Sequence, residues 1–172
     1  MKVKLVVEDE SRVAEWEIGH SLLAGLIGYD FPMPPSDHPL VDLLSRHPSS
    51  AVRRQVAESF ELPEDVLKRL ESDPIISVRE GLVSGHSTTK ERLSHVFLMR
   101  IIQESIEAAD RVIFDLSEFG EADMAEITKA LISHSDPAVR KRAAENDVGS
   151  KAGKKKLKAD DDVEVRKAAN DR

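Results

Sequence analysis

Hydrophobic positions recur with one spacing in four segments of the chain. A Leu is followed eight positions later by a Val, and this Val is followed directly by an Arg. Both pairs of copies repeat after 26 residues, whereas 61 residues separate the second copy from the third. A fixed period between about 20 and 50 residues predicts a solenoid, in which each unit buries its apolar face against its neighbours. The copies begin at Leu44, Leu70, Leu131 and Leu157, and their dipeptides are Val52-Arg53, Val78-Arg79, Val139-Arg140 and Val165-Arg166.

Apolar residues at helical spacing and prolines at helix starts define the first repeat pair. Val52, Val56 and Phe60 follow each other at four-residue intervals, which places them on one face of a helix. Three prolines fall at helix starts, where a missing backbone N–H costs little. Gly81 and Gly85 weaken the last helix of the pair, so neighbouring repeats must support it. We predict helices over residues 39–46, 50–60, 64–71 and 75–84.

The N-terminal 36 residues fit the repeat less well. Alternation over residues 2–7 predicts a short strand or an extended arm, and residues 11–27 have the apolar spacing of a helix. Residues 29–39 contain four prolines, which exclude a continuous helix. Tyr29 and Phe31 in this loop either cover the first repeat as a lid or form an exposed apolar patch.

The central residues 88–118 depart from the period. Thr88 and Glu91 form a capping box that predicts a helix start, and Asp110 predicts a second helix that Gly120 ends. These helices are either diverged repeats or a central support. Asp123 then opens a helix to about residue 134, and the second repeat pair follows it, with a charged ending that suits a terminal cap.

The segment VRRQVAESFELPEDVLKRLESDPIISVRE contains the elements of a known repeat. Asp73-Pro74 and Asp136-Pro137 precede Val-Arg dipeptides. This arrangement resembles the leucine-rich repeat variant, a short relative of HEAT and armadillo repeats with a DPxxxVRxxVAxN core. The resemblance covers about half of the chain and implies an all-α, right-handed α-α superhelix, which a short irregular N-terminal arm would precede. The family's founding type has a cysteine cluster for an iron–sulfur centre, and this chain has no Cys, so that cofactor is not implied.

The repeated Arg is the first candidate for function. Aligned guanidinium groups on one face can bind carboxylates or phosphates through two hydrogen bonds each. The alternative is structural: each Arg pairs with an acidic residue at a neighbouring turn, such as Asp73, Asp136 or Asp162. We expect the structural role to dominate, so that Arg79→Ala lowers stability more than partner binding. The candidate partner contacts are Arg53, Arg54, Arg140 and Arg142, together with the loop residues Tyr29 and Phe31.

Residue types that carry catalysis or bind metals do not form a recognisable pattern. None of the six histidines forms an HExxH or HxxxH pair. His47 and His134 occupy a repeat position at which the other copies have Asp73 and Asp160, which indicates a polar helix-end position. The chain has no Cys and no GxSxG, P-loop or GxGxxG motif. We expect no metal site, no cofactor and no catalytic residues, and an enzyme of unknown type is the second alternative to a binding role.

Charge is unevenly distributed along the chain. The net charge is −7, which opposes nonspecific binding to nucleic acid, but residues 139–172 carry 11 Lys and Arg against 7 Asp and Glu. Such opposite ends are compatible with association into a homo-oligomer. A nucleic-acid-binding HEAT-like protein remains the alternative, because phosphates can bind the cluster formed by Lys151, Lys154, Lys155, Lys156 and Lys158.

The sequence predicts a single α-solenoid domain over residues 1–172. No run approaches the roughly 18 apolar residues of a membrane span, and the first residues lack signal-peptide features. We therefore expect a cytoplasmic protein without a membrane partner. The predicted function is a non-catalytic scaffold that binds a protein or peptide on its concave face. The predicted parts are an N-terminal arm with helix and loop (1–36), a first repeat pair (37–87), central helices (88–120) and a second repeat pair with cap (121–172).

Overall fold

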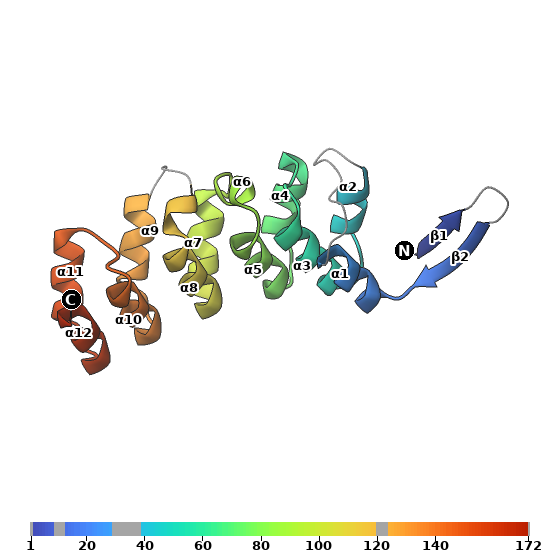
Figure 1. Cartoon of the computed structure of the whole chain (residues 1–172). Helices are drawn as coiled ribbons and strands as arrows, with labels where there is room; N and C mark the ends of the chain where they lie inside the picture. The colour runs from blue at the N-terminus through green and yellow to red at the C-terminus, as the bar shows by residue number, and fades with distance from the viewer. Residues whose placement is uncertain (1, 9–12, 29–38, 120–123, 172) are drawn as a thin grey trace. The chain divides into compact units, whose positions relative to one another are not determined.

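The computed structural model describes residues 2–8, 13–28, 39–119 and 124–171. This part of the chain is predominantly α-helical, as the sequence predicts, with twelve α-helices, one 3-10 helix and a two-stranded sheet (Figure 1). The chain divides into two compact units, Met1–His86 and Ser87–Arg172. Each unit contains its own set of buried apolar side chains.

The first unit begins with an antiparallel β-hairpin. β1 (Val3–Glu8) pairs with β2 (Val13–Ile18) over the full length of both strands. An ion pair between Lys4 and Glu15 joins the two strands on an exposed side. The short strand that the alternation over residues 2–7 predicts is confirmed as β1, and the description of the arm as irregular is wrong for the described residues.

The hairpin also corrects the helix predicted over residues 11–27. Its first half is β2, and helix appears only in α1 (His20–Gly28). The residues 14–18 alternate between apolar and charged, so their period of two fits a strand as well as part of a helical pattern. Pairing with β1 decides between the two, because a strand satisfies its backbone groups only through a neighbouring strand.

The four predicted helices of the first repeat pair are confirmed to within one residue at each end. They are α2 (Pro39–Ser45), α3 (Ser50–Ser59), α4 (Glu64–Glu71) and α5 (Ile76–Ser84). Val52, Val56 and Phe60 are buried, as their spacing predicts. α3 packs against both α1 and α5, and α2 packs against α3 and α4, so each helix pair covers the apolar face of the next.

The second unit opens differently from the prediction. The helix expected at the Thr88 capping box is a single turn, α6 (Ser87–Lys90), and the long helix starts later as α7 (His95–Glu104). The helix expected from Asp110 begins earlier, as α8 (Ile106–Phe114), and is followed by the 3-10 helix η1 (Leu116–Glu118). Ser94 and Ser105 decide these starts, because their hydroxyls accept the N–H groups of Phe97 and Ala108.

The rest of the second unit contains the second repeat pair. Its helices are α9 (Met124–Leu131), α10 (Pro137–Glu145), α11 (Lys151–Lys158) and α12 (Val163–Asn170). α7 packs against α9, and α8 packs against α10, in the same way that α2 packs against α4 and α3 against α5. Within this unit the packing favours the interpretation of α7 and α8 as a diverged repeat. Gly120 and Asp123, at which the sequence predicts a helix end and a helix start, lie outside the described residues.

Candidate interaction surface

One residue in each of the four repeats organises the turn between its two helices. Its side chain accepts the backbone N–H of the residue two positions later, which fixes the approach to the second helix. The prediction of a polar helix-end position is thus confirmed for His and Asp alike. The four bonds are Ser49 N–H to His47 (3.1 Å), Ile75 N–H to Asp73 (2.9 Å), Asp136 N–H to His134 (3.0 Å) and Asp162 N–H to Asp160 (2.9 Å).

The repeated Arg belongs to the same turn. Six residues after the turn residue, its Nη1 donates to the carbonyl oxygen of that residue. The distance is 2.8 Å from Arg53 to His47 and 2.7 Å from Arg140 to His134. Arg79 and Arg166 make the equivalent bond to the carbonyls of Asp73 and Asp160. In every copy, the Arg therefore helps to hold its own turn.

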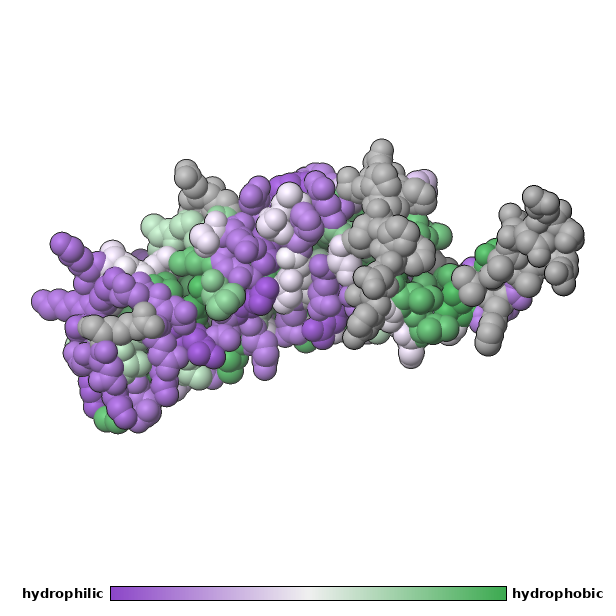
Figure 2. Space-filling model, viewed as in Figure 1, coloured by the Kyte–Doolittle hydropathy of each residue, from purple (hydrophilic) through white to green (hydrophobic). Residues whose placement is uncertain are grey.

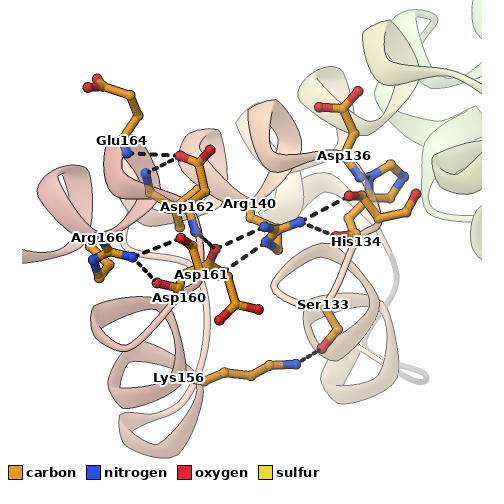
Figure 3. A network of polar contacts seen from close by, with 12 residues as sticks. Ser133, His134, Asp136, Arg140, Lys156, Asp160, Asp161, Asp162, Glu164 and Arg166 are labelled. Atoms are coloured by element: carbon orange, nitrogen blue, oxygen red, sulfur yellow. Dashed lines mark hydrogen bonds and ion pairs between the residues drawn. The ribbon is translucent and has the colours of Figure 1, made fainter.

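In the first copy of each pair, the Arg also reaches the next repeat. Arg140 donates from Nε and Nη2 to the two carboxylate oxygens of Asp160, at 2.8 and 2.9 Å (Figure 3). Arg53 binds Asp73 in the same way, at 2.7 and 3.0 Å. The Arg140 guanidinium holds the pKa of Asp160 below its ordinary value. The side chains are 13 and 7% exposed in the first pair and 16 and 7% in the second, so both bridges are largely withdrawn from solvent.

The predicted acidic partners are right in one pair and wrong in the other. Asp73 is the partner of Arg53, as predicted. In the second pair the partner is Asp160, while the predicted Asp136 and Asp162 accept N–H groups at the starts of α10 and α12. Each stands two residues after the turn residue of its repeat, directly before the helix, and is therefore an N-cap.

Arg54 and Arg142 differ from the repeated Arg because they are exposed. Arg54 pairs with Glu58 on its own helix, and its side chain is 48% exposed. Arg142 is 52% exposed and pairs with Asp110 of α8 and Glu145 of α10. The two loop candidates, Tyr29 and Phe31, lie outside the described residues.

Two adjoining grooves lie on either side of α10 in the second unit. The first, of about 440 Å³, lies between α8 and α10, and the second, of about 300 Å³, lies between α10 and α12. Lys141 and Glu145 line both, so the two grooves adjoin at these side chains of α10. Their walls carry both signs of charge, and Ile106 adds an apolar side chain that is 45% exposed. Charged and apolar residues that line the two grooves include Ile106, Asp110, Lys141, Arg142, Glu145 and Glu164.

A third groove, of about 620 Å³, lies on other helices of the same unit. Its lining includes the apolar residues Met124 and Ile132, together with Gly153, and the basic residues Lys129 and Lys156. Gly153 allows a close approach, because a Cβ atom there would lie 2.6 Å from Cδ1 of Ile132. Lys156, one member of the predicted lysine cluster, donates to the Ser133 hydroxyl.

A buried charge cluster in the second unit is not predicted from the sequence. The Lys90 side chain is 3% exposed, and its Nζ lies 2.6 Å from Asp115 and 2.7 Å from Glu118. Arg111 also pairs with Asp115, at 2.7 Å. The partners of Lys90 are 25 and 28 residues away, so no local pattern indicates them. The cluster fastens α6 to the end of α8 and to η1.

Three histidines, His20, His47 and His134, make contacts within the fold. His47 is buried, and its ring lies 4.7 Å from that of His20 in an edge-to-face contact. Burial and the nearby charge of His20 lower the pKa of His47. Nε2 of His134 contacts the carbonyl oxygen of Ile102 at 2.9 Å. Among the described residues, no group of three or more His, Asp or Glu side chains could hold a metal ion.

Comparison with known proteins identifies no relative. No family model matches the chain, and no curated protein or solved structure matches it either. Within the described residues, no helix has the length and apolar character needed to cross a membrane.

Proposed function

We propose that this protein is a non-catalytic scaffold that binds a protein or peptide segment along the adjoining grooves of α8, α10 and α12. The observation that supports it most directly is that the two grooves lie on either side of α10 and share Lys141 and Glu145. Adjoining grooves along successive helices suit an extended chain better than a compact small molecule.

The exposed ion pairs of the grooves favour exchange with a ligand. Arg142 and Asp110 are 52 and 46% exposed, and Lys141 and Glu164 are 40 and 60% exposed. Exposed pairs of this kind contribute at most about 1 kcal/mol, so a peptide can replace one partner at little cost. Arg53 and Arg140 are committed to largely buried bridges and are poor candidates for binding. We therefore retain Arg142 as the leading partner contact, and Lys141 joins it.

The fold that we propose around this surface is the right-handed α-α superhelix that the repeat resemblance implies. The support is that α2 to α5 in one unit and α7 to α10 in the other pack with the same succession of helix contacts. Small-angle X-ray scattering tests the proposal, because a superhelix gives an elongated particle and a globular arrangement gives a compact one. A cytoplasmic location is part of the same proposal.

A peptide selection tests the proposed function. Random peptides displayed on phage are selected on the whole protein, and the affinity of enriched sequences is measured by calorimetry for three forms of the protein. We expect Arg142→Glu to weaken binding at least about tenfold, because it removes a groove cation beside Asp110 and Glu145. Lys155→Glu is the matched control, since Lys155 is exposed on α11 and lies outside these grooves.

The outcomes separate binding from stability. The thermal midpoint of Arg142→Glu should stay within a few degrees of the wild-type value, because its ion pairs are exposed. Enriched peptides that bind Arg142→Glu as tightly as the wild type would contradict this site. Equal loss in both variants would indicate a general charge effect and would also count against it.

A further inference from the structure

The fourth repeated Arg, Arg166, makes the same contacts to its own turn as Arg140 does. Its contacts to a following repeat differ. Its Nη1 donates to the carbonyls of Asp160 and Asp161, as Nη1 of Arg140 donates to those of His134 and Ser135. The guanidinium group is therefore held in the same position relative to its turn. In Figure 3, Arg140 and Arg166 approach the turn of Asp160 from opposite sides.

Arg166 differs from Arg53 and Arg140 at the second edge of the guanidinium group, which Nε and Nη2 form. In Arg53 and Arg140 this edge binds an Asp that stands 20 residues later, at the turn of the next repeat. Among the described residues, no hydrogen bond or ion pair uses Nε or Nη2 of Arg166. A fork that binds carboxylate twice elsewhere in this chain is thus presented at the outer edge of α12.

The identity of a turn residue, Asp or His, goes with the presence or absence of an Arg in the preceding repeat. Where the turn residue is Asp, at Asp73 and Asp160, the preceding repeat supplies an Arg. Where it is His, at His47 and His134, the preceding helices α1 and α8 have an uncharged residue, Leu23 or Ala109, at the fourth position, which Arg53 and Arg140 occupy in α3 and α10. The physical reason is that a carboxylate at this withdrawn position needs a cation, whereas a neutral His accepts the turn N–H without one.

The exposed residues of the turn and helix of Arg166 include the acidic Asp161 and Glu164, whereas α11 has a basic side. Lys151, Lys155 and Lys158 lie on the side of α11 opposite Gly153 and Lys156, the two residues that contact Ile132 and Ser133 after α9. These three lysines are exposed, and hydrophilic residues predominate over α11 and α12 in Figure 2. Val163 at the start of α12 is 60% exposed.

We propose that the outer edge of α11 and α12 docks an acidic helical hairpin of another protein, whose turn Asp binds the Nε–Nη2 edge of Arg166. The argument for this occupant is the chain's own precedent, since the same fork receives a turn Asp at Arg53 and at Arg140. The basic surface of α11 adds charge complementarity. This surface is separate from the grooves of the proposed function, so either proposal can fail alone.

The test attaches a hairpin of known type to the edge. A second copy of residues 147–172 is added after Arg172, which places the copy of Asp160 20 residues after Arg166, the spacing of both existing bridges. Urea unfolding is measured for the 172-residue and extended chains, each with and without Arg166→Gln. We expect Arg166→Gln to reduce the folding equilibrium constant at least about tenfold more in the extended chain, because only there does it break a bridge.

Two matched variants assign the effect. Changing the added copy of Asp160 to Asn in the extended chain should remove the extra effect of Arg166→Gln, whereas Lys167→Gln, an exposed neighbour on α12, should act equally in both chains. An equal effect of Arg166→Gln in both chains overturns the proposal, as does an added hairpin that stays unfolded by circular dichroism. Self-association of the 172-residue chain that Arg166→Gln abolishes, measured by sedimentation, also overturns it, since the occupant would then be a second copy.

Discussion

At the scale of single residues, burial decides what each Arg does. Arg140 and Asp160 form a bidentate bridge, and both side chains are mostly withdrawn from water. Removing one member leaves the other charge without a partner in a poorly solvated place. Arg142, two positions later, pairs in solvent, where its charge is hydrated with or without a partner.

We predict losses of stability of different size for substitutions at these two residues of α10. Arg140→Gln should lower the free energy of unfolding by about 2–4 kcal/mol, because it leaves Asp160 unpaired. Arg142→Gln should lower it by less than about 1 kcal/mol. Urea unfolding of both variants measures the difference, and equal losses would show that the Arg140 bridge contributes no more than a surface pair.

We predict a pH effect from His47. Burial and the charge of His20 lower the pKa of His47 below the ordinary 6.5, so as pH falls through 6.5 the unfolded chain takes up a proton that the folded chain resists. Stability that is complete above pH 6.5 is then lost as the pH falls toward the folded pKa. His47→Asn, which retains an acceptor for Ser49 N–H, should flatten the pH dependence of urea unfolding over this window. An unchanged slope would contradict the prediction.

At the scale of elements, close helix packing explains Gly81 in α5 and Gly85 directly after it. A Cβ atom on Gly85 would lie 2.5 Å from the carbonyl oxygen of Ala57, and one on Gly81 would lie 3.0 Å from that of Arg54. Both contacts are to the backbone of α3, which cannot rotate away as a side chain can. Gly81, which weakens α5 as an isolated helix, and Gly85 at its end therefore allow its tight packing against α3.

We predict that Gly85→Ala lowers the free energy of unfolding by about 1–3 kcal/mol, since α5 must shift away from α3. Gly25→Ala in α1 is the control, because among the described residues a Cβ atom there meets nothing within 4 Å. It should raise stability by up to about 1 kcal/mol through helix propensity. Thermal unfolding checks both, and a neutral Gly85→Ala would contradict the close packing.

At the scale of the whole molecule, charge differs between the two units. Residues 1–86 contain 9 Lys and Arg against 15 Asp and Glu, whereas residues 87–172 contain 16 against 17. The basic surface of α11 is thus a local feature in a chain that is acidic as a whole. Because the chain as a whole is negatively charged, its long-range attraction to a polyanion is weak.

We predict that the protein does not retard duplex DNA at about 0.15 M salt, because the net negative charge outweighs the local cluster. An electrophoretic mobility assay at several salt concentrations checks this. Retardation at this salt concentration that is lost when the five clustered lysines are changed to Gln would favour the nucleic-acid alternative over a protein partner.

The sequence by itself determined the helices of the repeat pairs and the polar role of their turn residues. Both depend on interactions within a few residues: apolar spacing in α3, and the bond from Ser49 N–H to His47. Tertiary structure alone decided the strand β2, the choice of Asp160 over Asp162 by Arg140, and the burial of Lys90 between Asp115 and Glu118. These depend on which groups from distant segments come within hydrogen-bond distance, and a periodic pattern contains no such distances.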